Sequence, residues 1–215
     1  MKTIFALCLS LCATPVGAHP HIFINTGLVF LINAENQLTH VQVTWEYDEL
    51  YSLLVTEDMG LDDDYDGVLT AADSAALTGF DMNWVDGYNG DLVAQMDKMP
   101  LTLGPPSAPT ATLKDGKIIT THLRAVQGAP SVTGTLNFRP YDGTYYTAYE
   151  VGLGVDVKGR AGCDVALDAP DIAGALAMTK AELSALPEDT DMDVAGLGDI
   201  GSRFATQVLV TCVAL

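Results

Sequence analysis

The chain has 215 residues, of which 48% are hydrophobic and 18% are charged, and its formal net charge is −18. This composition excludes a disordered or low-complexity chain and indicates a folded domain with a sizeable core. The strong negative charge argues against binding to nucleic acid or to an anionic membrane surface.

Residues 1–18 have the pattern of an export signal. Lys2 supplies a positive end, a short apolar run follows, and Val16-Gly17-Ala18 is a small-residue cleavage site. The apolar run is too short to cross a bilayer as a helix. We therefore expect cleavage after Ala18 and a single mature periplasmic domain over residues 19–215.

The cysteines indicate one disulfide in the mature chain. Cys8 and Cys12 lie in the export signal, which leaves Cys163 and Cys212. Two cysteines in an oxidising compartment most simply pair with each other. The alternative is a thiolate metal site, which requires reduced sulfur.

The acidic residues are concentrated in the first half of the mature chain. Residues 19–97 contain fifteen Asp and Glu and no Lys or Arg, whereas average usage gives about ten basic residues. A surface of this kind attracts cations. The other interpretation is that the charge only keeps an exported protein in solution.

The segments before residue 100 predict two strands and then helices. Residues 21–32 and 37–47 alternate between apolar and polar side chains, as strands do. A helix is expected from Asp48, which is a good N-cap, and a short one over 71–77. The segment 79–97 is ambiguous and is assigned as helix interrupted by glycines.

After Pro100 the sequence is rich in Thr, Val, Gly and Pro, and predicts a β-rich half that carries the disulfide. Strands occur here in groups rather than alternating with helices, so we expect an α+β fold with mainly antiparallel sheet and a few helices. The expected strands are 110–114, 117–124, 131–139, 145–152 and 207–213, and the expected helices are 175–186 and 198–206.

The stretch from Asp62 to Asp73 has the spacing of an EF-hand loop, with Gly67 at the sharp turn. Asp73 stands where a longer Glu normally binds through both oxygens, so we expect weaker calcium binding or tolerance of Mg²⁺. The alternative is an acidic turn without an ion. The residues at the six ligand positions are Asp62, Asp64, Asp66, Val68, Thr70 and Asp73.

His19 and His21 form a candidate transition-metal site. Residues i and i+2 of a strand project to the same side, and imidazole suits Zn²⁺, Cu²⁺ and Ni²⁺. Cleavage after Ala18 also frees the amine of His19 as a ligand. Pro20 excludes the square-planar motif that needs a deprotonated amide at the second residue. Carboxylates of Asp48 or Glu49 are the expected additional ligands, and the alternative is a pair of surface histidines with no metal.

The remaining polar residues give no catalytic pattern. His40 and His122 stand alone on predicted strands, and we expect both to be ordinary surface residues. No Ser–His–Asp or Cys–His arrangement and no phosphate-binding glycine loop is evident, so an enzyme is not expected. The acidic run 188–193 lacks the glycine of an ion-binding loop and is expected to be a solvated turn.

Five motifs occur in order along the chain: AHPHIF at 18–23, VTWEYDELYS at 43–52, DDDYDG at 62–67, YDGTYY at 141–146 and GSRFATQVLVTC at 201–212. Together they resemble a family of exported bacterial proteins of poorly defined function, often labelled ABC-type transport periplasmic components. Asp73 and Gly143 depart from the pattern of that family.

The resemblance implies a periplasmic partner of a nickel/cobalt-type membrane transporter, with zinc as the metal. Two alternatives stay open. One is a copper protein with a histidine brace, either a chaperone or an oxidative enzyme, in which His40 or His122 folds onto the pair. The other is a calcium-stabilised interaction module whose histidines are incidental.

Overall fold

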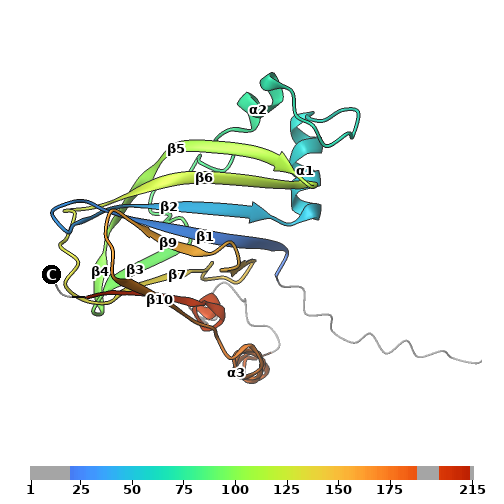
Figure 1. Ribbon diagram of the computed structural model, residues 1–215. Coiled ribbons are helices and arrows are strands. Elements are labelled where there is room, and N and C mark those ends of the chain that lie inside the picture. Colours follow the sequence, from blue (N-terminus) through green and yellow to red (C-terminus); the bar gives the residue numbers. More distant parts are fainter. Residues whose placement is uncertain (1–19, 188–198, 214–215) are drawn as a thin grey trace, which may run out of the picture.

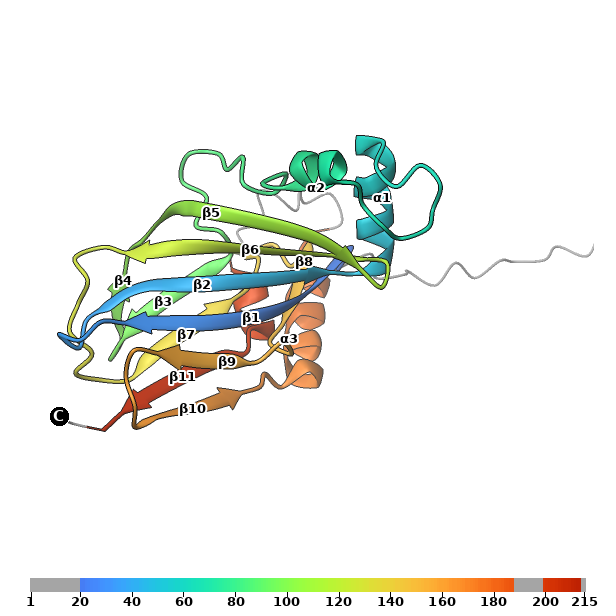
Figure 2. The same cartoon turned by 45° about the horizontal axis from the view of Figure 1, so that its top comes forward.

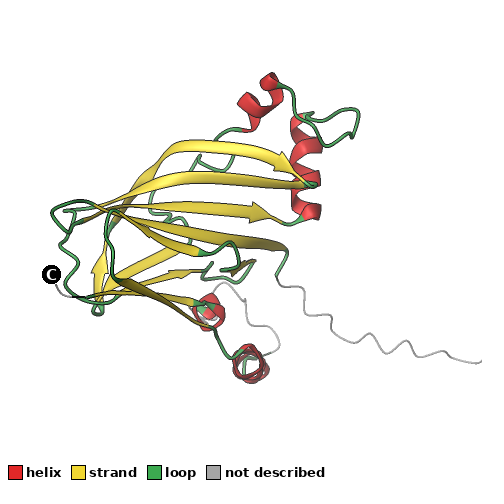
Figure 3. Ribbon diagram, viewed as in Figure 1, coloured by secondary structure: helices red, strands yellow, loops and turns green. Residues whose placement is uncertain are grey.

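The computed structural model describes residues 20–187 and 199–213 and has two mostly antiparallel β-sheets with three α-helices in those ranges. The export signal, His19 and the acidic run 188–193 lie outside the described residues. Figure 1 shows the sheets as two layers, and Figure 3 shows helices at one end of these layers and beside them. The expected α+β class is confirmed.

The first sheet has the order β5-β6-β2-β1-β8, and β9 also pairs with β1. β1 runs parallel to β8 and β9 and antiparallel to β2. The strands are β1 (Ile22–Ile32), β2 (Leu38–Tyr47), β5 (Leu103–Lys114), β6 (Lys117–Val126), β8 (Thr147–Glu150) and β9 (Val155–Lys158).

The second sheet has the order β10-β11-β7-β3-β4, and all its pairings are antiparallel. Figure 2 shows it as the layer behind and below the first sheet. Its strands are β3 (Leu92–Met96), β4 (Met99–Leu101), β7 (Leu136–Pro140), β10 (Cys163–Asp168) and β11 (Gln207–Cys212).

The core lies between the two sheets. In β2, Val41, Val43 and Trp45 point inward and the residues between them are more exposed, as the alternation predicts. The two layers meet where the ring of Phe30 in β1 packs edge-on against Phe138 in β7, with centroids 4.8 Å apart. The acidic segment 19–97 and the β-rich segment 98–215 both contribute strands to both sheets.

Helix α1 (Glu49–Met59) begins at Asp48, as predicted, and ends at Gly60 in the left-handed conformation. It is anchored to the first sheet because the Ser52 hydroxyl accepts a hydrogen bond of 2.9 Å from the backbone N–H of Ile118 in β6. A loop leads from α1 into α2 (Ala71–Leu77). Figure 1 shows both helices at one end of the first sheet.

Two expected helices differ from the structure. The segment 79–97 is not helical but forms turns followed by β3, because Gly79, Gly87 and Gly90 adopt positive φ angles that interrupt a helix. The segment 198–206 contains only the short 3₁₀ helix η1 (Ile200–Phe204), whereas α3 (Ile172–Ser184) begins three residues earlier than expected.

The strand predictions fail mainly at the edges of the sheets. β5 begins at Leu103 despite three prolines, which an edge strand tolerates because one side of it needs no N–H donor. β7 begins at Leu136 rather than 131. β4, β9 and β10 were not predicted.

Candidate cation site and buried polar layer

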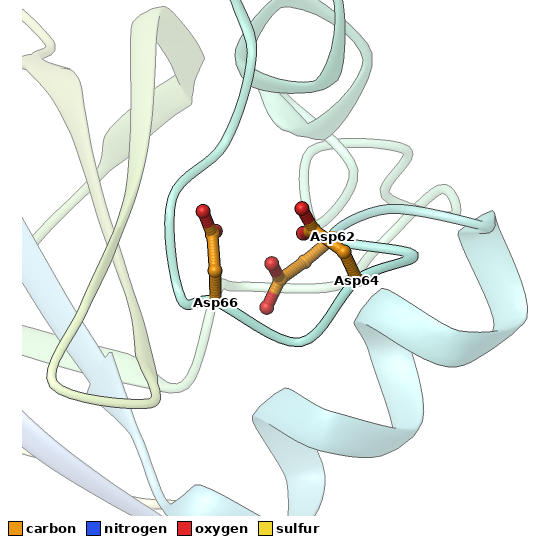
Figure 4. Close-up of side chains that lie close together, drawn as sticks. All are labelled: Asp62, Asp64 and Asp66. Atoms are coloured by element: carbon orange, nitrogen blue, oxygen red, sulfur yellow. The ribbon is translucent and has the colours of Figure 1, made fainter.

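Three aspartates converge in the loop between α1 and α2. The side chains of Asp62, Asp64 and Asp66 each offer a carboxylate oxygen, and these oxygens all lie within 4.8 Å of one another. Figure 4 shows the three carboxylates on the inside of the loop. Asp64 and Asp66 are exposed and Asp62 is partly buried, so the group is open to solvent.

The loop backbone explains this convergence. Asp62 and Tyr65 have φ angles of 55° and Gly67 has a φ of 76°. These three left-handed residues, which lie close together in the sequence, bend the chain into a tight loop. The Gly67 N–H donates to both oxygens of Asp62, at 3.1 and 3.2 Å. Glycine is suited to this position because its φ is unfavourable for other residues.

The second half of the predicted EF-hand loop is used differently. Thr70 caps α2, and Thr70 and Asp73 form a reciprocal capping box in which the Asp73 carboxylate accepts from both the backbone N–H and the hydroxyl of Thr70. Val68 donates its N–H to Asp66 at 2.7 Å. The structure therefore brings together positions 1, 3 and 5 of the loop and does not show a complete EF-hand.

His21 lies just before β1, and Asp48 follows the end of β2, opposite Phe23. The N–H of His21 donates to the Tyr146 carbonyl at 2.8 Å, and the two rings are 4.8 Å apart. The oxygens of Asp48 accept from the N–H groups of Phe23 and Tyr51, at 2.8 and 2.9 Å. Asp48 thus joins β1 to the first turn of α1.

The predicted transition-metal ligands are not assembled among the residues that the structure describes. Within them, the three loop aspartates are the only group of three or more His, Cys, Asp or Glu side chains with ligand atoms within 4.8 Å of one another. His21, Asp48 and Glu49 do not form such a group, and His19 lies outside these residues.

The other two histidines lie away from His21. His40 pairs with Leu31, ten residues further along the strand direction and about 30 Å away at the usual rise. His122 points inward from β6, and its side chain is 1% exposed. The expectation that His122 is a surface residue is therefore wrong, because it occupies the inward-facing register of β6 and packs against the rings of Trp45 and Trp84.

His122 is packed against aromatic rings instead of polar partners. Its ring centroid is 4.8 Å from Trp45 and 5.6 Å from Trp84, both edge-on. Neither ring nitrogen has a hydrogen-bond partner among the described residues. Burial, with the nearby charge of Arg124, lowers the pKa of His122 to about 3, so it is neutral at ordinary pH.

Two partly buried aspartates, Asp81 and Asp91, accept hydrogen bonds from hydroxyl groups of the first sheet, and together with His122 they form a polar layer. Asp81 accepts from the hydroxyls of Tyr47 and Thr120 through one oxygen, at 2.8 Å each. Asp91 accepts from the Tyr149 hydroxyl at 2.9 Å. Burial raises the pKa of Asp81, and it raises the pKa of Asp91 to about 6.

No local sequence pattern marks these two aspartates. Asp81 and Thr120 are 39 positions apart in the sequence, and Asp91 and Tyr149 are 58 positions apart. The hydrogen bonds fasten the irregular segment after α2 to the interior of the first sheet, which is a structural task. The alternation of residues 37–47 places Tyr47 on the inward face. This indicates a buried hydroxyl but does not identify the residue that accepts its hydrogen bond.

The predicted disulfide is present. Cys163 and Cys212 lie directly opposite each other on β10 and β11 and are bonded. A disulfide of this kind is consistent with a location outside the cytoplasm. Within the described ranges, no helix combines the length and apolar character needed to cross a membrane.

Comparison with known proteins assigns the chain to a family but not to a function. No curated protein matches the chain. A family model does match, over residues 4–212, and its description is "Protein of unknown function (DUF1007)". The match covers nearly the whole sequence and includes all five motifs. The chain therefore belongs to this DUF1007 family of proteins of unknown function.

Proposed function

We propose that this chain is an exported divalent-cation-binding protein. The observation that carries the proposal is the convergence of Asp62, Asp64 and Asp66 within 4.8 Å. Three carboxylates at this separation repel one another unless a cation lies between them. Carboxylate oxygens from alternate residues of a tight loop are the ligands that hard cations such as Ca²⁺ and Mg²⁺ prefer.

The cation at this loop is expected to bind weakly. Asp73 is occupied by the cap of α2, so the bidentate ligand of a complete EF-hand is missing from the group. Water molecules would complete the coordination sphere. We therefore expect a dissociation constant for calcium in the millimolar rather than the submicromolar range, as in extracellular calcium-binding modules.

A calcium titration of two matched variants tests the loop. Asp64→Asn removes one charge from the converging group, whereas Asp63→Asn removes the same charge from an exposed neighbour outside it. We expect Asp64→Asn to weaken calcium binding about tenfold or more and Asp63→Asn to change it little, because affinity follows the ligand charge. Equal affinities in a calorimetric titration would exclude the site.

We further propose zinc as the metal that the protein handles, with His19 and His21 as ligands and a periplasmic location after cleavage at Ala18. Cu²⁺ and Ni²⁺ are the alternatives for the same ligands. Both oxygens of Asp48 already accept backbone N–H groups, so Glu49 is the better candidate for a third ligand. The partner would be a membrane metal transporter, as the resemblance implies.

A calcium-stabilised interaction module is a second candidate, because α1 leads directly into the acidic loop and exposes three leucines. Leu50, Leu53 and Leu54 are 65%, 48% and 57% exposed. Their spacing places them on one face of the helix. A copper site with a histidine brace receives no comparable support, since His40 and the buried His122 lie away from His21.

A further inference from the structure

A cleft of about 400 Å³ opens between the edge of the first sheet and the segment around η1. Its walls come from β8, the end of β7, η1 and the start of α3, together with Phe23 of β1. Segments far apart in sequence therefore meet here. Figure 2 shows β8, η1 and α3 at this end of the molecule, on the side away from the acidic loop.

Aromatic and apolar side chains form most of the cleft. Tyr145 and Phe204 stack face to face at 3.9 Å, and Phe23 and Ile172 are 51% and 46% exposed. The hydroxyl of Tyr149, at the inner end, is already bonded to Asp91. A volume of this size, with mainly apolar walls and few polar groups, is typical of small-molecule sites.

The charge of the cleft restricts what it can bind. Among the described residues that line it, Glu150 is the only charged side chain, and it is exposed. The Tyr141 hydroxyl in the wall donates to Asp199, which adds a second carboxylate close behind. Neither nearby arginine lines the cleft: the guanidinium of Arg139 lies 5.4 Å from the Tyr141 ring centroid, and Arg203 of η1 is paired with Glu182 at 2.8 Å.

We propose that this cleft binds a small organic cation, with an apolar or aromatic body against Phe23, Tyr145 and Ile172 and an ammonium group directed at Glu150. The electron-rich faces of aromatic rings and a carboxylate both attract such a group. An anionic ligand of the same size would meet Glu150 and no compensating positive side chain. The site goes beyond metal binding and uses none of the proposed metal ligands.

Benzyltrimethylammonium and phenylacetate are suitable probes because they share a ring and differ in the sign of the charge. Binding is followed by ¹H–¹⁵N NMR on the full mature protein. We expect the cation to shift the amide signals around Glu150 and Ile172, and phenylacetate to leave them unchanged. Equal shifts with both probes, or no shifts at these positions with either, would overturn the proposal.

Two exposed positions provide the variants. Glu150→Gln is expected to weaken binding of the cation about threefold, as for an exposed ion pair. Ile172→Lys places a positive charge at the mouth and is expected to abolish binding. Asp156→Asn, on β9 outside the cleft, is the control and should bind as the wild type does. Unchanged affinity in Glu150→Gln would show that the carboxylate has no role and would contradict the proposal.

Discussion

Asp48 shows how a residue that attracts metal-site predictions can have a structural task. It was a natural candidate ligand, being acidic and close to the histidine pair in the predicted hairpin. In the structure it caps α1 and also accepts the N–H of Phe23 in β1. These two hydrogen bonds hold the beginning of the helix against the beginning of the strand. The N-cap role was predictable from sequence, but the bond to Phe23 was not, because it depends on the register of β1 against β2.

Replacing Asp48 by alanine should therefore lower stability whether or not metal is present. Loss of an N-cap costs about 0.5–2 kcal/mol, and the Phe23 N–H loses its acceptor as well, so we expect roughly 1–2 kcal/mol. Urea denaturation in the presence of EDTA measures this. Asp48→Asn retains an acceptor oxygen and should lose less. An unchanged midpoint in Asp48→Ala would contradict the assigned role.

His122 is the residue whose position the sequence least revealed. A histidine between Thr121 and Leu123 fits either face of a strand, and only the inward register of β6 decides which one. Its pKa of about 3 lies below the ordinary value of 6.5, because charging it inside the aromatic layer is unfavourable. In the unfolded chain it is protonated more easily, so its contribution to stability falls as the pH drops below 6.5.

His122→Leu should remove this pH dependence. Between pH 6.5 and 3 the wild type should lose up to about 1.4 kcal/mol per pH unit relative to the variant, and above pH 7 the difference between the two should not change with pH. The pKa of Asp91, raised from 3.8 to about 6, gives a slope of the opposite sign in part of this range, but it is common to both proteins. Thermal unfolding followed by circular dichroism at several pH values measures the difference, with His40→Leu as control. Parallel curves for the wild type and His122→Leu would contradict this explanation.

At the scale of elements, hydrophobic alternation predicted the central strands and failed at the edges. β1, β2 and β6 each bury one face, so the period of two is visible in their sequences. β10 has no buried residue in its six positions, so the short alternation of Cys163, Val165 and Leu167 with Asp164, Ala166 and Asp168 does not mark a buried face. It is held by β11 on one side and by the disulfide at its first residue. An exposed strand of this kind depends on a covalent link more than a central strand does.

Removal of the disulfide should destabilise the protein and loosen β10 first. The bond joins residues 49 positions apart, and a loop of that length gives a stabilisation of about 4 kcal/mol in the chain-entropy model. We expect Cys163→Ser/Cys212→Ser to lose most of this in urea denaturation. Hydrogen exchange should rise most in β10 and its partner β11. A double variant as stable as the wild type, with unchanged exchange, would contradict this expectation.

At the scale of the whole molecule, the acidic half and the β-rich half are parts of the same two sheets. Local sequence could not predict this, because the parallel pairing of β1 with β8 and β9 joins residues more than 100 positions apart. The candidate cation loop is the opposite case. Its three aspartates lie within five residues, so sequence spacing was enough to predict that they converge. The capping of α2 by Thr70 and Asp73 was not foreseen, since the same residues fit both an EF-hand and a capping box.

The most direct test of divalent-cation binding is the metal content of the protein purified from its own export compartment. Elemental analysis of the wild type should find zinc near one equivalent, and calcium retained when millimolar calcium is present during purification. His21→Ala should lose zinc and keep calcium, whereas Asp64→Asn should lose calcium and keep zinc. If neither metal exceeds its level in an unrelated exported protein prepared in the same way, the proposed function is wrong.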